Sequence, residues 1–241
     1  MAHSRFRSTL QSGGAVRQRG FTLVEMGIVL AIIGVILTGI FGGQSLIRSA
    51  KVSDVVAIVE DLRTATTLFK KRFNYLPGDF PAAAGDIAGI PSPAPTVPET
   101  GNGNGQIGVF GNVVAGTGLA VAATEVAWAP LHLFNAGLIG KVDSSQPLRM
   151  ISTSYGPVHL VSSVIAGGLV PGAGPLVTGF IAQNPTARNA IVFFNLPCDV
   201  VRDVDLKIDD GNGQTGRAVG NFAAGGACPA TNIITWYAVA L

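Results

Sequence analysis

Apolar residues fill the chain almost without interruption from Phe21 to Ile47, and Glu25 is the one charged residue among them. About 20 consecutive apolar residues are enough to cross a bilayer as an α-helix. The run therefore predicts a membrane-spanning helix. The residues before it carry four arginines and no acid. Because positive charge tends to stay on the cytoplasmic side of a membrane, the N-terminus is expected in the cytoplasm and everything after the span outside.

From residue 48 the pattern becomes that of an amphipathic helix. Apolar residues recur at steps of three and four, as on one face of an α-helix. They are Val52, Val55, Val59, Leu62, Ala65, Phe69 and Phe73. Pro77-Gly78 ends the pattern. The two segments together predict one helix from about Phe21 to Asn74, ~80 Å long at 1.5 Å per residue. Its second half is expected to pack against the rest of the chain.

The remaining chain predicts an antiparallel β-sheet with long loops. Five runs rich in β-branched or aromatic residues are bounded by Gly, Pro or Asn and predict strands. The runs are Leu148–Ser154, Val158–Ile165, Leu176–Ala182, Ala190–Asn195 and Asn232–Ala240. Residues 78–118 are rich in Gly, Pro and Ala and predict loops, with turns at Gly101–Gly105. The predicted fold class is α+β, with the long helix covering one face of the sheet.

Two further segments predict helices. Residues 124–137 offer apolar surface, with Thr124 as a cap and Pro130 expected to kink or split the helix. Pro197–Ile208 matches both the alternation of a strand and one face of a helix. A proline near the first turn, an acid close behind it and a glycine past the end favour the helix.

Composition narrows the class of protein. Charged residues make up only 12% of the 241 residues, and 32 Gly and 14 Pro suit a loop-rich exported domain better than a helical cytosolic enzyme. The net charge of +2 comes from Arg5, Arg7, Arg17 and Arg19. Without them the chain has 12 basic and 14 acidic side chains. The composition therefore gives no support to nucleic-acid binding.

The chain has two cysteines, Cys198 and Cys228. The membrane segment places them in an exported domain, where the oxidising environment predicts a disulfide between them. The alternative is two separate buried thiols.

The start of the apolar run carries the most specific motif. Gly20 precedes Phe-Thr-Leu-Val-Glu, so a basic leader, a glycine, an aromatic residue and an acid stand in order before a long apolar helix. This junction resembles that of the type IV prepilins, which mature into type IV pilins and pseudopilins. Weaker likeness to longer pilin-like proteins extends over most of the chain. It lies in Tyr75–Phe80, Trp128–Ile139 and Leu206–Gly211 with Gly216.

The resemblance implies that a prepilin peptidase cuts between Gly20 and Phe21 and N-methylates Phe21. It also implies that Glu25 neutralises the amino group of Phe21 on an adjacent subunit and sets the axial register. An unpartnered charge in a membrane is costly, which agrees with that role. The alternative is a carboxylate that only reaches headgroup water. The expected organisation is a leader (1–20), a transmembrane or filament-core helix (21–47), an amphipathic helix (48–74) and a globular head domain (75–241).

The function implied by the resemblance is that of a structural subunit of a type IV pilus-like filament. Partners would be other copies of the chain or related pilins, the prepilin peptidase, and an inner-membrane assembly platform with its ATPase motor. The protein would cross the inner membrane once and end in an extracellular or periplasmic filament. The alternative is a minor pilin or a type II secretion pseudopilin that acts as a tip or binding module in adhesion, DNA uptake or protein secretion.

No catalytic motif is evident, because the three histidines are scattered and neither Gly-x-Ser-x-Gly nor His-Glu-x-x-His occurs. We therefore expect no enzyme activity and no cofactor, and His132 is expected to be a packed or surface histidine. Calcium is the one metal ion for which the sequence offers candidate ligands. Four aspartates could hold Ca²⁺ together with backbone oxygens, as in C-terminal loops of some pilin relatives. They are Asp203, Asp205, Asp209 and Asp210. Their spacing is not that of an EF-hand, and the alternative is a capped helix that runs into an Asp-Gly turn.

Overall fold

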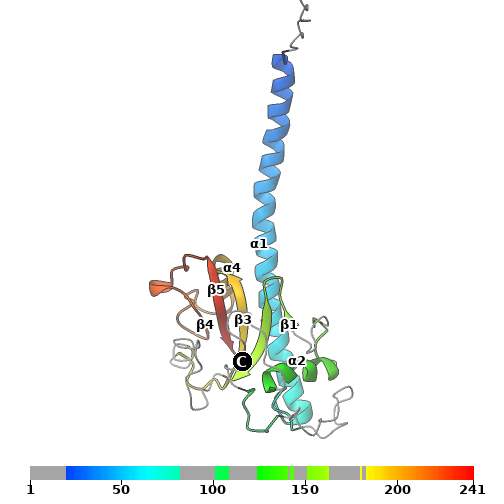
Figure 1. Cartoon of the computed structure of the whole chain (residues 1–241), viewed down its shortest axis with the longest axis vertical. Helices are drawn as coiled ribbons and strands as arrows, with labels where there is room; N and C mark the ends of the chain where they lie inside the picture. Colours follow the sequence, from blue (N-terminus) through cyan, green and yellow to red (C-terminus); the bar gives the residue numbers. More distant parts are fainter. Residues whose placement is uncertain are drawn as a thin grey trace, which may run out of the picture. The chain divides into compact units, whose positions relative to one another are not determined.

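The computed structural model describes residues 20–81, 101–108, 124–140, 142–143, 151–162, 180 and 183–241. The chain divides into two compact units, Met1–Leu46 and Ile47–Leu241. Helix α1 covers Leu23–Phe73 and therefore has residues in both units (Figure 1). The predicted helix is confirmed almost residue for residue. The leader, apart from Gly20, lies outside the described residues.

The first unit contains the apolar part of α1. The side chains of residues 21–40 are exposed, and Leu23 has 93% of its surface accessible. Among the described residues, α1 is the one helix long and apolar enough to cross a membrane, by length and composition only. An exposed apolar surface of this length needs lipid or other protein around it.

The second unit is built on a five-stranded antiparallel sheet with the order β1-β2-β3-β5-β4. The strands are β1 (Ile151–Ser152), β2 (Pro157–Ser162), β3 (Asn189–Pro197), β4 (Ala218–Gly220) and β5 (Ile233–Ala240). The central pair, β3 and β5, stays in register from Ala190 opposite Ala240 to Pro197 opposite Ile233. These two strands come from distant parts of the chain and form the middle of the sheet (Figure 1).

The second half of α1 covers one face of this sheet. Val55, Val59 and Phe69 have no exposed surface, and they share a core with Ile191 of β3 and Tyr237 of β5. The intervening strand residues point to the other face, where they form a second apolar cluster. This alternation is the period of two that a strand imposes. The predicted α+β class, with the amphipathic helix on an antiparallel sheet, is confirmed.

The described part of the second unit also contains two shorter α-helices and a 3₁₀ helix, η2 (Ala224–Gly226). Helix α2 covers Glu125–Asn135 and helix α4 covers Cys198–Ile208. The choice of helix over strand for the α4 segment is confirmed. Thr124 is the N-cap residue of α2, as predicted, although it makes no side-chain capping hydrogen bond. Pro130 lies inside α2 and does not split it.

The five predicted strands are confirmed to different extents. Four of the five runs contain a strand, although residues 148–150 and 163–165 lie outside the described residues. In Leu176–Ala182 only Phe180 is described, and it is helical; the rest of this predicted strand lies outside the described residues. Strand β4 was not predicted. Helix α1 ends at Phe73, before Pro77, because Asn74 adopts a left-handed backbone conformation (φ 62°) that stops a helix.

His132 of α2 is a packed core residue, as expected. Its Nδ1 accepts a hydrogen bond from the backbone N–H of Gly78 at 3.0 Å, and its ring stacks on Phe69 at 6.0 Å between centroids. Burial lowers the pKa of His132 to about 4, because the charged form would lose its water. The fold therefore holds the neutral imidazole.

The depressed pKa of His132 predicts a loss of stability in mild acid. Below pH 6.5 the unfolded histidine takes up a proton, whereas the folded one does so only near pH 4. We expect wild-type protein to lose roughly 2–3 kcal/mol more unfolding free energy than His132→Gln between pH 7 and pH 4.5. Asp205 acts in the opposite direction, because burial raises its pKa to about 6, and the comparison with the variant cancels its contribution.

The measurement is urea unfolding of the full chain in detergent, followed by tryptophan fluorescence, because both tryptophans lie in the second unit. The same pH dependence in wild type and variant would show that His132 does not titrate with folding.

Candidate functional site

The junction at the start of α1 is open to solvent. Gly20, Phe21 and Thr22 precede the helix and are exposed, and Phe21 has 82% of its surface accessible. A Cβ added at Gly20 would meet no atom within 4 Å. The fold therefore does not require a glycine there, and the bond between Gly20 and Phe21 lies in accessible, non-helical backbone.

Thr22 and Glu25 form a capping box on the first turn of α1. The backbone N–H and the hydroxyl of Thr22 both donate to Oε2 of Glu25, at 2.8 and 2.9 Å. The backbone N–H of Glu25 is 3.2 Å from the hydroxyl oxygen of Thr22, which accepts its hydrogen bond. This reciprocal pattern satisfies donors that the start of a helix leaves unpaired. The Thr-x-x-Glu spacing is readable in the sequence, but we had not predicted this interaction.

The capping box gives Glu25 hydrogen bonds but no opposite charge. The positive end of the helix dipole favours an acid at this position by a modest amount. Neither of the donors from Thr22 carries a formal charge, and both reach the same oxygen, Oε2. The described residues show no hydrogen bond to Oε1. A cationic group could therefore approach Glu25 without displacing the cap.

A comparison with known protein families bears on this junction and on the apolar part of α1. Residues 16–41 match the family profile of the prokaryotic N-terminal methylation motif. The chain carries the N-terminal methylation motif. This motif is typical of type IV pilins and pseudopilins, which are generally structural proteins and not enzymes. The methylation motif includes Gly20, Phe21 and Glu25 and leaves the second unit unmatched. Comparison of the chain with curated proteins and with solved structures gives no match.

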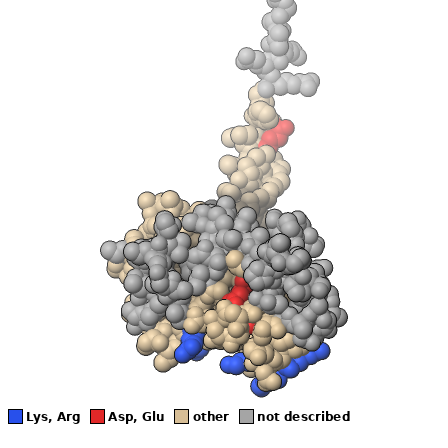
Figure 2. Space-filling view, turned by 60° about the horizontal axis from the view of Figure 1, so that its bottom comes forward, with Lys and Arg blue, Asp and Glu red and all other residues tan. Residues whose placement is uncertain are grey.

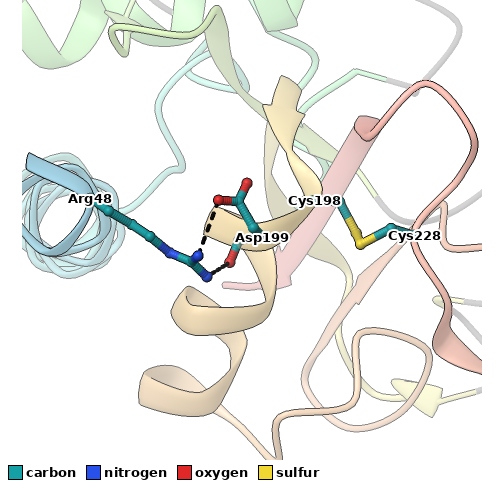
Figure 3. Close-up of a disulfide and its surroundings, with 4 residues drawn as sticks. All are labelled: Arg48, Cys198, Asp199 and Cys228. Atoms are coloured by element: carbon teal, nitrogen blue, oxygen red, sulfur yellow. Dashed lines mark hydrogen bonds and ion pairs between the residues drawn. A yellow bond between two sulfur atoms is a disulfide. The ribbon is translucent and has the colours of Figure 1, made fainter. Parts of the chain in front are cut away.

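The second unit contains the predicted disulfide. Cys198 and Cys228 are bonded, with their Cα atoms 5.7 Å apart. Cys198 is the first residue of α4 and is fully buried. Figure 3 shows the bond fixing the start of α4 to the segment that precedes β5. The pairing of the two cysteines is confirmed.

An ion pair fixes α4 from the side of α1. The guanidinium of Arg48 contacts Asp203 at 2.7 Å. It also contacts the carboxylate of Asp199 at 3.3 Å and donates to the backbone oxygen of Asp199 at 3.0 Å (Figure 3). All three side chains are more than a third exposed, so the gain in stability is modest. Asp203 is thus engaged by an arginine.

Asp205 is held inside the core. It is fully buried, and it accepts a hydrogen bond from the hydroxyl of Tyr237 at 2.7 Å. Burial raises the pKa of Tyr237 well above its ordinary range, as it raises that of Asp205. The pair links α4 to β5 across the interior of the second unit.

The remaining two aspartates organise the turn after α4. Asp209 accepts from the backbone N–H of Ala218 at 2.9 Å, and Asp210 accepts from the hydroxyl of Thr215 at 2.6 Å. The described residues contain no group of three or more His, Cys, Asp or Glu that could hold a metal ion. Each of the four aspartates therefore contacts a different protein group. This arrangement favours the helix that runs into an Asp-Gly turn, and Gly211 indeed has a positive φ of 81°.

The disulfide predicts a measurable loss of stability on its removal. The bond closes a sequence separation of 30 residues, and in the chain-entropy account this stabilises a fold by roughly 3–4 kcal/mol. We expect Cys198→Ala/Cys228→Ala to lose about that much unfolding free energy, measured by urea unfolding with tryptophan fluorescence. As a control, reductant should destabilise wild type and leave the double variant unchanged. Insensitivity of wild type to reductant, with both thiols open to alkylation, would contradict the bond.

Proposed function

We propose that the chain is a structural subunit of a type IV pilus-like filament. A prepilin peptidase would cut it between Gly20 and Phe21, methylate Phe21, and leave the first half of α1 as the polymerising element. The observation that carries this proposal is the methylation motif over residues 16–41, placed at an accessible junction before an exposed apolar helix.

The cut would create a positively charged partner for the carboxylate of Glu25. It would leave a free amino group on Phe21, four residues before Glu25. In the bilayer the capping box provides the carboxylate with hydrogen bonds, which lowers the cost of holding an acid there without removing it. In a filament the amine of a neighbouring subunit would approach the free Oε1. Cap and ion pair can then exist together on one carboxylate.

Charge pairing would set the register, because apolar packing alone does not. Lipid tails are as apolar as the side chains of α1, so a helix gains little hydrophobic free energy when it leaves lipid for the core of a filament. The described apolar side chains are exposed all around the first unit, and many axial positions would bury them equally. A buried ion pair is satisfied at one position only, since one partner without the other is strongly destabilising.

The second unit would form the outer layer of the filament. Its core, its disulfide and the ion pair of Arg48 are complete within Ile47–Leu241. The precursor would be anchored in the inner membrane by α1 with its N-terminus in the cytoplasm. An assembly platform and its ATPase motor would extract it, as the resemblance to prepilins implies. Other copies of the chain, or related pilins, would then be its permanent partners.

A minor pilin or type II secretion pseudopilin that acts as a binding module is the second candidate. The observation that favours it is an open cleft of 550 Å³ in the second unit, lined by Lys70 and Arg188 among others. A subunit present only at the tip and a subunit present along the whole filament are separated by immunogold labelling.

The proposal predicts opposite outcomes for two substitutions in the capping box. Glu25→Gln keeps an oxygen that accepts from Thr22 but removes the charge. Thr22→Val removes the hydroxyl of the cap and keeps the charge. If the charge sets the register, Glu25→Gln should reduce assembled filaments at least tenfold, and Thr22→Val should stay within about twofold of wild type, as one modest capping contact is lost. The measurement is the amount of sheared filament per membrane-bound subunit, by immunoblot.

Both variants should still lose residues 1–20, because neither residue flanks the cut bond. The reverse result, in which Thr22→Val fails to assemble and Glu25→Gln assembles normally, would mean that the cap is the essential element and that the proposed charge pairing is wrong.

A further inference from the structure

The second unit contains an open cleft, lined by both polar and apolar groups, that the filament proposal does not use. It has a volume of 550 Å³ and lies between the last turns of α1, the segment 74–79, the 101–108 loop and the turn before β3. A volume of this size is within the range of small-ligand sites. Figure 2 brings the end where α1 stops forward and shows Lys and Arg side chains along the edge of the second unit.

Two cations line the cleft from different elements. Lys70 comes from the last turn of α1 and Arg188 from the residues just before β3. Both are exposed, and in the part of the chain that the structure describes neither side chain makes an ion pair. A lysine in the last turn also suits the negative end of the helix dipole. That explanation does not apply to Arg188, which is in no helix.

Asp79 is the one acidic side chain among the described residues of the cleft wall, and its carboxylate is held by hydrogen bonds from the protein. It is buried, and its carboxylate accepts from the backbone N–H groups of Asn104 at 3.0 Å and Gly105 at 2.8 Å. Asn189 fixes the same loop by accepting from the N–H of Ile107 at 2.9 Å. This wall of the cleft is therefore preformed, and the N–H groups of these three loop residues are turned inward, toward the protein.

Thr66 lines the cleft with a hydroxyl that lacks a partner. The residue is 3% exposed, and its Oγ1 is buried with no hydrogen bond among the described residues. A buried hydroxyl left unpaired costs free energy. Threonine in a helix has two accessible χ1 rotamers, and the proposal below assigns this unpaired hydroxyl to a ligand in the cleft.

Tyr75 adds an aromatic surface. It lines the cleft, its ring packs on Phe80 at 5.7 Å between centroids, and 37% of the residue is exposed. Two cations, an unpaired hydroxyl and an amphipathic ring suit a ligand that combines an anionic group, hydroxyl groups and a ring with an apolar face. We propose that this cleft binds an acidic sugar unit of a polysaccharide, with its carboxylate held between Lys70 and Arg188.

The test is calorimetric titration of the full chain in detergent with a galacturonate trimer. Maltotriose serves as the neutral counterpart of similar size and hydroxyl content. We expect the galacturonate trimer to bind at least tenfold more tightly than maltotriose, because the carboxylate supplies the charge-assisted contacts. Arg188→Gln and Lys70→Gln should each weaken it at least fivefold, and Thr66→Val at least twofold.

Arg202→Gln is the matched control. Arg202 is an exposed arginine of α4 that does not line the cleft, so the substitution changes the charge equally and should leave the affinity unchanged. No binding of the galacturonate trimer, equal binding of maltotriose, or equal losses in the Arg188 and Arg202 variants would overturn the proposal. Tighter binding of an oligothymidylate through the same residues would also overturn it, in favour of a nucleic-acid site. None of these outcomes depends on filament assembly, because the titration uses the unassembled subunit.

Discussion

A single carboxylate in the apolar part of α1, where residues 21–47 carry no other charge, is the constraint on which the account of this protein depends. Glu25 lies on the first turn of α1, where the backbone N–H and hydroxyl of Thr22 donate to one of its oxygens. The helix thereby satisfies the acid by hydrogen bonding but not by charge, and the other oxygen stays open. A cut after Gly20 would supply the missing charge from the chain itself. The methylation motif, the capping box and the apolar run are thus all linked through the charge of Glu25.

The second unit is stabilised by means that do not involve that carboxylate. One face of α1 packs on the sheet and shares a core with β3 and β5. Helix α4 is held at its start by the disulfide of Cys198, on one side by Arg48, and inside by the contact between Asp205 and Tyr237. Changes at Glu25 should therefore leave this unit folded, and changes in its core should leave the start of α1 intact. This separation allows assembly and folding to be measured independently.

The spacing of apolar residues along the chain made most of the fold predictable. The features that were not predicted are those that leave no such spacing in the sequence. The apolar run and the steps of three and four after it define α1 because nothing else fits so long a pattern. The apolar residues of Pro197–Ile208 fit both the alternation of a strand and one face of a helix. The proline at its start and the glycine past its end correctly favoured the helix. Strand β4 has three residues, too few for any period to appear. The spacing of Thr22 and Glu25 is that of a capping box, but the sequence motif that includes Glu25 already accounts for an acid at this position by its charge. The cleft could not be predicted, because α1, the 101–108 loop and Arg188 are brought together only by tertiary packing.

The most direct test of the central claim is mass spectrometry of the intact N-terminus of protein recovered from assembled fibres. We expect a chain that begins at Phe21 and carries one methyl group on its amine, since that cut creates the positive charge proposed to pair with Glu25 of a neighbouring subunit. A chain that still begins at Met1, or one that begins well past Phe21, would contradict it.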